Sequence, residues 1–429
     1  MSEKISLDSS DNIFQSHISY IRRLLFIKDM HICFVCREYP PSLRGGGIAS
    51  YIKEVAHGLN ALGHRVTVVC ASDDTRKEKS YDEDGVNIIR LKGGDFIIPQ
   101  VEKTSIVKKF RTFYRYLPYR KRIREALKTI RNIDIIEVAE YGAEAYYLQE
   151  LGIPLVIRLH TPALMDHYNF GILPFNAHTA KFYWQGRHEL ATVKRAQYIT
   201  SCSTSLKEWS VKELRIDRDK IKVIYNPLNT EKWTDIAFTR ERNNEIKEIL
   251  FAGTICDWKG CGDLAAACKS LADEGIKLRL NMVGKAGDFA EQLKNKYKTH
   301  PWFNLVGKVP REELIARYTT TDLVVFPSWW ENMPMVCIEA MSQGAIVLGS
   351  SSGGMSEIIE DGKSGFLVEP RDSKILAEKI RQLLKLDTKQ RVIISNNAKQ
   401  RIKKAFSMDI VLERQIEYYK YVIKDFKSL

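Results

Sequence analysis

The chain has 429 residues, of which 44% are hydrophobic and 28% charged, a composition typical of globular proteins. This length is too great for one ordinary core, so we expect two domains of roughly 200 residues each. No apolar run reaches the roughly 18 residues that a membrane-spanning helix needs. Residues 1–29 show no secretory signal, so we expect a cytoplasmic protein. The net charge of +13 indicates an anionic partner, such as nucleic acid, a phospholipid surface or a phosphorylated substrate.

The first half of the chain alternates between strand and helix patterns after an extension of residues 1–29. A buried apolar run at 30–36 is followed by the loop PPSLRGGGIAS, a helix pattern at 51–63 and a second apolar run at 64–72. This order predicts parallel strands joined by a right-handed crossover. We expect further strands at 86–92, 133–139, 154–160, 196–203 and 222–227.

The same alternation begins again near residue 248, with a strand, a helix at 260–275 and a strand at 278–284. Further strands are expected at 303–309, 322–328 and 345–351. The sequence therefore predicts an α/β fold of two doubly wound Rossmann-like domains that face each other across a cleft. We place these domains at 30–228 and 229–408, with a helix at 409–429 that packs back on the body.

Two glutamates eight residues apart form the most specific local feature, in the segment ENMPMVCIEAMSQG. Glu331 follows a strand end, and Glu339 is expected in the first turn of a helix that ends at Gly344. Two carboxylates with this spacing can enter one cleft, where a carboxylate suits the vicinal hydroxyls of a ribose. The alternative is that Glu339 serves the helix N-terminus and Glu331 is solvated.

Four other segments are candidates for ligand contact. Lys259-Gly260 opens a helix, where a lysine and backbone amides can hold a diphosphate. The glycines at 45–47 and at 353–354 allow close approach of a phosphate or sugar, or are simply flexible turns. His160 ends a strand and faces the expected cleft, where it binds substrate or is a satisfied structural group.

The order of these signals is more specific than any one of them. The glycine loop with LNALGHRVTVV is followed by RLH, AQYITSCS, VIYNPLNTEKW, FAG…WKG, LNMVG and VGKV. The segment DLVVFPSWWENMPMVCIEAMSQG and the later GGMSEII and DGKSGFLV complete the set. Over residues 30–410 the sequence resembles the retaining glycosyltransferases of family 4, which have the GT-B fold. The resemblance implies transfer of a hexosyl unit from a nucleotide diphosphate sugar, with retention of anomeric configuration by front-face attack.

The resemblance also assigns roles to individual positions. Glu339 is implied to bind the donor ribose, Glu331 the donor sugar or its transfer, and Lys259 the departing diphosphate, while His160 lies beside the transferred sugar. The other implied donor contacts are Gly46, Gly47, Gly253, Thr254 and the backbone amides of Met333, Pro334 and Met335. Thr254 stands where many relatives have an arginine, so phosphate neutralisation is expected to rest more on Lys259.

Donor, acceptor and cofactors are less closely defined by the residues. A UDP-hexose is the first expectation and GDP-mannose the second, with a glycan or lipid-linked acceptor in cell-surface polysaccharide or glycolipid assembly. No metal-ligand cluster and no cofactor motif is visible, so we expect a metal-independent enzyme that needs no cofactor. The alternatives are a non-catalytic nucleotide-sugar-binding relative, a transferase that acts on small molecules, a sugar-nucleotide epimerase and a phosphorylase-like enzyme.

A basic stretch at 103–131 contains eleven Lys or Arg residues and one acid. A helix pattern places apolar side chains on one face and basic ones opposite, and Pro118 is expected to end it. The stretch is either a solvated helix or an interfacial segment that binds an anionic membrane at the inner face of the plasma membrane. Nucleic acid is not expected, because no binding module is recognisable. The candidate membrane contacts are Lys108, Lys109, Arg111 and Arg115.

Overall fold

The computed structural model describes residues 29–42, 46–73, 77–93, 106–229 and 245–428, with the backbone alone described for 106–117 and Lys181. The chain forms two compact units whose segments interleave along the sequence. The first comprises 1–158, 191–198 and 415–429, and the second comprises 159–190 and 199–414. The domain boundaries predicted at 228 and 408 stay predictions.

The first sheet has the strand order β3-β4-β2-β1-β5-β6-β7-β8. Its central strand β1 pairs in parallel with β2 and β5, and β3 pairs antiparallel with β4. Both faces of the central strands are buried, which explains their almost continuous apolar sequences. The bounds are β1 His31–Cys36, β2 Arg65–Ala71, β3 Lys79–Glu83, β4 Val86–Leu91, β5 Ile135–Ala139, β6 Leu155–Leu159, β7 Tyr198–Ser201 and β8 Ile221–Val223.

Two helices of the first unit differ from the sequence prediction. Helix α2 (Gly47–Ala61) begins inside the glycine run rather than at residue 51. Helix α3 (Ile106–Thr129) continues through Pro118, so the prediction that this proline ends the helix was wrong. The turns that follow Pro118 bury Tyr119, Ile123 and Leu127 at a spacing of four residues. This packing outweighs the low helix propensity of one proline.

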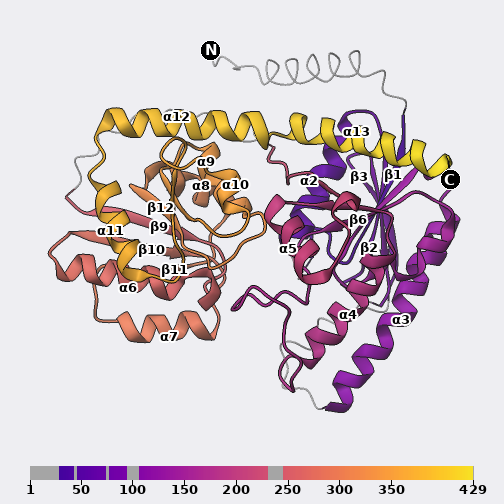
Figure 1. The fold of residues 1–429 in the computed structure, drawn as a ribbon, viewed down its shortest axis with the longest axis horizontal. Helices are drawn as coiled ribbons and strands as arrows, with labels where there is room; N and C mark the ends of the chain where they lie inside the picture. Colours follow the sequence, from indigo (N-terminus) through magenta and orange to yellow (C-terminus); the bar gives the residue numbers. More distant parts are fainter. Residues whose placement is uncertain (1–28, 43–45, 74–76, 94–105, 230–244, 429) are drawn as a thin grey trace, which may run out of the picture. The chain divides into compact units, whose positions relative to one another are not determined.

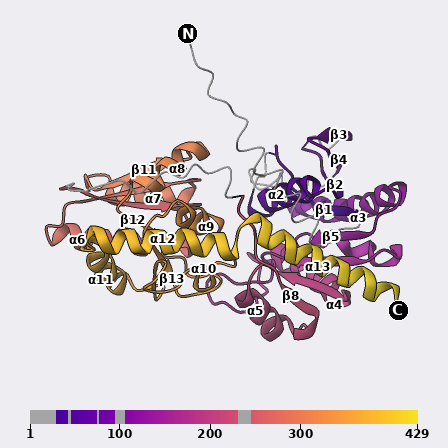
Figure 2. The same cartoon turned by 90° about the horizontal axis from the view of Figure 1, so that it is seen from above.

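Residues 415–427 of the C-terminal helix α13 (Met408–Lys427) belong to the first unit, where they lie beside α2 (Figure 2) and bury the polar side chains of Gln415 and Tyr419. Glu137 of β5 is fully buried and accepts hydrogen bonds from Tyr51 (3.0 Å), Gln415 (3.2 Å) and Tyr419 (2.8 Å). Burial raises the pKa of this carboxyl, and the three donors oppose that shift. The network ties residues 415–427 to the first unit.

The second unit contains a parallel sheet of order β11-β10-β9-β12-β13-β14, of which Figure 1 labels β9, β10, β11 and β12. Alternate side chains of its inner strands, such as Ile249 and Phe251, pack with α6 and α11 in one core cluster. Helices α9 and α12 pack against each other. The bounds are β9 Lys247–Ala252, β10 Leu278–Val283, β11 Phe303–Gly307, β12 Leu323–Phe326, β13 Val347–Ser350 and β14 Phe366–Val368.

Helices of 4 to 13 residues join the strands of the second sheet, as expected for a doubly wound α/β unit. Among the residues that the structure describes, no helix has the length and apolar character needed to cross a bilayer. The remaining bounds are α4 Ala180–Arg195, α5 Thr204–Leu214, α6 Cys261–Asp273, α7 Asp288–Tyr297, α8 Arg311–Thr320, α9 Met335–Ser342, α10 Met355–Ile358, α11 Ser373–Leu384 and α12 Thr388–Ala405.

Candidate functional site

Lys259 and Glu331 form an ion pair in the second unit, where the loops after β9 and β12 meet. The ammonium nitrogen of Lys259 donates to Oε1 of Glu331, and the two side chains are only 17% and 14% exposed. Gly260 makes this contact possible, because it has a φ of 69° and a Cβ there would lie 2.1 Å from the carbonyl oxygen of Pro327. The Lys-Gly pair therefore places a cation against the end of β12.

The loop that carries Glu331 is packed against Gly353 and Gly354. The amide of Gly354 donates to the carbonyl oxygen of Glu331 at 2.7 Å. A Cβ on Gly353 would lie 2.3 Å from that oxygen, and one on Gly354 would lie 1.9 Å from the carbonyl oxygen of Asn332. The structure thus shows a role that the sequence did not suggest, since these glycines allow the backbone of the Glu331 loop to approach closely.

His160 lies at the end of β6, buried, and belongs to the same unit as Glu331. Its carbonyl oxygen accepts a hydrogen bond from Nδ2 of Asn332 at 2.8 Å, and the same nitrogen donates to the hydroxyl of Thr161 at 3.0 Å. Asn332 thus connects the His160 turn to the Glu331 loop. Asn332 was not among the predicted site residues, because its side-chain amide belongs to no recognisable sequence pattern.

Glu339 lies in the second turn of α9 rather than in the first turn as predicted, because the helix begins at Met335. Its Oε1 accepts from Nη2 of Arg311 at 3.2 Å, and its side chain is 15% exposed. The prediction that the backbone amide of Pro334 contacts the donor was also wrong, since proline has no N–H. Pro334 is instead the residue before the helix, so the orphan amides at this end are those of Met335 and Val336.

A cluster of aromatic side chains lies around the segments that carry Lys259 and Glu331 in the second unit. His167 stacks on Trp258 with ring centres 4.6 Å apart and planes 16° apart. Two further ring pairs, Tyr168 with Trp329 and Phe170 with Trp330, lie 5.7 and 5.6 Å apart. The guanidinium of Arg371 lies over the rings of Phe170 and Trp329 at 4.8 and 4.3 Å. Sequence reasoning missed His167 and Trp258, although Trp258 directly precedes Lys259.

Two other implied donor contacts lie at the end of β9. The amide of Gly253 donates to the carbonyl oxygen of Val283 at 2.9 Å. The carbonyl oxygen of Gly253 lies so close to Gly284 that a Cβ on Gly284 would be 1.8 Å from it. Thr254 is exposed directly after Gly253. Among the described residues, no group of three or more His, Cys, Asp or Glu side chains is placed to hold a metal ion.

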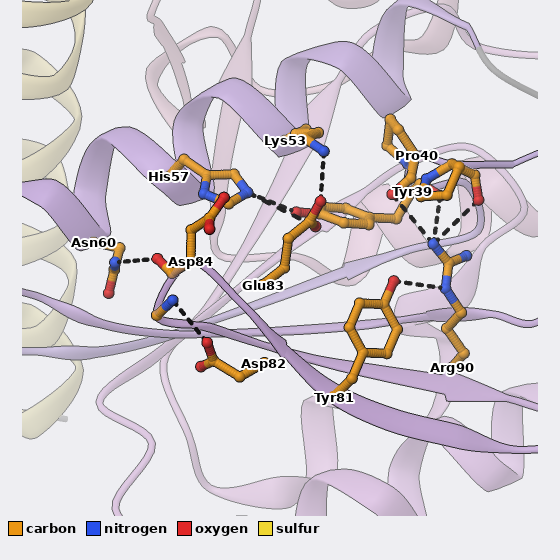
Figure 3. A network of polar contacts seen from close by, with 12 residues as sticks. Tyr39, Pro40, Lys53, His57, Asn60, Tyr81, Asp82, Glu83, Asp84 and Arg90 are labelled. Carbon is orange, nitrogen blue, oxygen red and sulfur yellow. Dashed lines mark hydrogen bonds and ion pairs between the residues drawn. The ribbon is translucent and has the colours of Figure 1, made fainter.

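The glycine segment belongs to the first unit and is described from Gly46 onward. Gly46 precedes α2 without a side-chain cap, and a Cβ on Gly47 would meet no atom within 4 Å. The first amides of α2 are therefore available to an anion. Figure 3 shows how the preceding turn is held, with Nη2 of Arg90 donating to the carbonyl oxygens of Tyr39, Pro40 and Pro41 at 3.1 to 3.2 Å.

Two family descriptions match consecutive parts of the chain. Residues 45–232 match "Glycosyltransferase Family 4" and residues 233–401 match "Glycosyl transferases group 1". The chain belongs to the group 1 glycosyltransferases of family 4 type. This finding confirms the resemblance read from the motifs, and the transferase is of the nucleotide-sugar-binding GT-B class.

Individual relatives agree with this assignment. An uncharacterized glycosyltransferase of Methanocaldococcus jannaschii is 28% identical in an alignment of length 410 that covers 92% of this chain and 99% of the relative. Sucrose-phosphate synthase of Thermosynechococcus elongatus has a TM-score of 0.75 at 18% identity, over 92% of this chain and all of that one. Anabaena HepE in complex with UDP-glucose has a TM-score of 0.65 at 19% identity, over 93% and 100%. These solved structures confirm the predicted GT-B fold of two Rossmann-like domains.

Proposed function

We propose that this glycosyltransferase moves a hexosyl unit from a UDP-hexose to a glycan or lipid-linked acceptor with retention of configuration. GDP-mannose is the second candidate donor, and cell-surface polysaccharide or glycolipid synthesis is the proposed setting. The observation that supports it best is the half-buried Lys259–Glu331 pair beside the start of α9. A crystal structure of HepE, which shares the fold, contains bound UDP-glucose.

The proposed mechanism uses charge that is already in place before the donor binds. Lys259 neutralises the departing diphosphate, whose negative charge grows in the transition state. The orphan amides of Met335 and Val336 add hydrogen-bond donors at the N-terminus of α9, where the helix dipole favours an anion. The leaving phosphate oxygen accepts the proton of the acceptor hydroxyl as the new glycosidic bond forms on the same face.

The carboxylates have binding roles in this proposal. Glu339 accepts hydrogen bonds from the ribose hydroxyls, and Glu331 from a hydroxyl of the donor sugar. Both carboxylates already hold a cation, Arg311 and Lys259 respectively. When the donor binds, its hydroxyl groups therefore replace these cations as partners of the two carboxylates. Neither carboxylate becomes an unpaired buried charge, which reduces the desolvation cost of donor binding.

A thermal-shift screen tests the proposed donor class. UDP-glucose, GDP-mannose and ADP-glucose are each added to the purified protein at equal concentration. A ligand that binds only the folded state raises Tm, by an amount set by its concentration relative to Kd. We expect the largest rise with UDP-glucose. A larger rise with GDP-mannose would replace the donor assignment, and no rise with any nucleotide sugar would contradict the proposal.

Donor turnover is expected to survive removal of divalent metal ions. Lys259 and helix amides supply the positive charge that a metal ion supplies in other transferases. The release of nucleoside diphosphate should be the same, within error, with excess EDTA and without it. Complete loss with EDTA that Mg²⁺ or Mn²⁺ restores would show that a metal ion is required.

The first half of α3 is proposed to bind anionic membranes, although its side chains up to residue 117 lie outside the described part of the structure. Each basic residue near an anionic leaflet contributes on the order of 1 kcal/mol. We expect co-sedimentation with anionic vesicles at low salt, lost at high salt and in a triple Ser variant of Lys108, Arg111 and Arg115. The matched control changes three exposed lysines on and just after α7 to Ser, Lys294, Lys296 and Lys298. Equal loss in both variants would show that net charge alone is responsible.

A further inference from the structure

The side chain of His167 lies within the aromatic cluster around Lys259, but it has no part in the mechanism proposed for sugar transfer. The imidazole stacks on the indole of Trp258, and the ammonium nitrogen of Lys259 lies 4.5 Å from the centre of the same indole ring. Charges on Glu331 and Lys259 both act on this imidazole. His167 is therefore a third polar group next to the Lys259–Glu331 pair.

The backbone around His167 is fixed by a tight turn. The carboxylate of Asp166 accepts from the amide of Tyr168 at 2.8 Å and from Nδ2 of Asn169 at 2.9 Å. The carbonyl oxygen of Asp166 accepts from the amide of Phe170, also at 2.8 Å. With the turn closed by these bonds and the ring stacked on an indole, the imidazole has a defined position before any ligand binds.

The two nitrogens of this imidazole differ in their surroundings. Nδ1 is buried, and no described protein group hydrogen-bonds to it. Burial lowers the pKa of His167 below its ordinary value and outweighs the opposing charges of Glu331 and Asp166, while Lys259 also lowers it, so the neutral ring predominates at pH 7. A buried N–H without an acceptor is rarer than a buried acceptor without a donor. The single ring proton is therefore placed on Nε2, which makes that nitrogen a hydrogen-bond donor.

We propose that His167 binds the hexosyl unit of the donor, with Nε2–H donating to a sugar hydroxyl while Trp258 supports the ring. A neutral N–H suits a neutral hydroxyl, whereas the charged diphosphate is met by Lys259. This inference rests on the proposed function, and it makes His167 a residue that distinguishes one donor sugar from another.

Three variants separate hydrogen bonding from ring stacking. His167→Phe keeps an aromatic ring on Trp258 and removes the N–H. His167→Gln loses the ring and places an amide N–H close to the position of Nε2. The matched control is His300→Phe, since His300 stacks on Trp302 in the same unit, with ring centres 5.6 Å apart and planes 26° apart.

Isothermal titration with UDP-glucose and with UDP measures the contribution of the sugar. One hydrogen bond contributes about 0.5–1.5 kcal/mol. We therefore expect His167→Phe to weaken UDP-glucose binding by roughly 3- to 10-fold and to leave UDP binding unchanged. His167→Gln should recover part of the lost affinity, and His300→Phe should match the wild type for both ligands.

Other outcomes overturn the inference in recognisable ways. Wild-type affinity of His167→Phe for UDP-glucose would show that no hydrogen bond to the sugar exists. Equal weakening of UDP and UDP-glucose would assign His167 to the nucleotide or to the structure of the site. Failure of the wild-type protein to bind any UDP, GDP or ADP sugar would instead overturn the proposed function, and this inference with it.

Discussion

Replacing Lys259 with Ala is expected to lower kcat at saturating donor by about 10²- to 10³-fold, the usual effect of removing one preorganised donor to a developing anion. The donor KM should change much less, because the diphosphate gains its extra negative charge only in the transition state. Steady-state release of nucleoside diphosphate, measured over a range of donor concentrations, separates the two parameters.

The matched control for Lys259→Ala is Lys277→Ala. Lys277 pairs with Glu245 in the same unit, but both side chains are largely exposed, at 61% and 75%. Loss of a surface ion pair costs little, so this variant should keep the wild-type kcat. Melting temperatures of both variants show whether each is folded. An unchanged kcat in folded Lys259→Ala would contradict the leaving-group role.

Replacing Glu339 with Gln is expected to raise the donor KM by roughly 10- to 100-fold, because charge-assisted hydrogen bonds contribute about 1.5–3 kcal/mol. The amide keeps the size of the side chain but loses one acceptor oxygen and the negative charge. Ribose contacts are similar in the ground state and the transition state, so kcat should change little. Direct titration with UDP should show the same loss of affinity.

Glu313→Gln is the matched control for Glu339→Gln. Glu313 pairs with Arg317 on α8, the helix that also carries Arg311, and its side chain is 45% exposed. This variant changes the same charge a short distance from Glu339, and its KM should equal that of the wild type. If Glu313→Gln raised KM as much as Glu339→Gln, a general electrostatic effect would replace the ribose assignment.

Much of the fold was predictable because parallel strands buried on both faces are short apolar runs between helix patterns. Edge strand β3 was missed, since KSYDE is polar and all of its residues are partly or fully exposed. The helix through Pro118 was missed for a different reason. Its stability comes from the burial of Tyr119 and Ile123, which depends on residues far away in sequence.

The candidate site was predictable where a motif fixes both spacing and chemistry, as for Lys259 and Glu331, which the structure brings into contact. The close backbone approach at Gly353 could not be foreseen, because it depends on which loop lies opposite. His167 had no signal in the sequence, because Trp258 lies 91 positions away and the two rings meet only in the folded chain.

Release of nucleoside diphosphate from UDP-glucose tests the central claim most directly. The residues around Lys259 and Glu331 are proposed to bind a nucleotide sugar and to promote departure of its diphosphate. Purified wild-type protein should therefore release UDP slowly from UDP-glucose in water, at a rate that Lys259→Ala lowers by about 10²- to 10³-fold and Lys277→Ala leaves unchanged. Release at the same rate by wild type and Lys259→Ala would contradict this claim, as would no release from UDP-glucose, GDP-mannose or ADP-glucose.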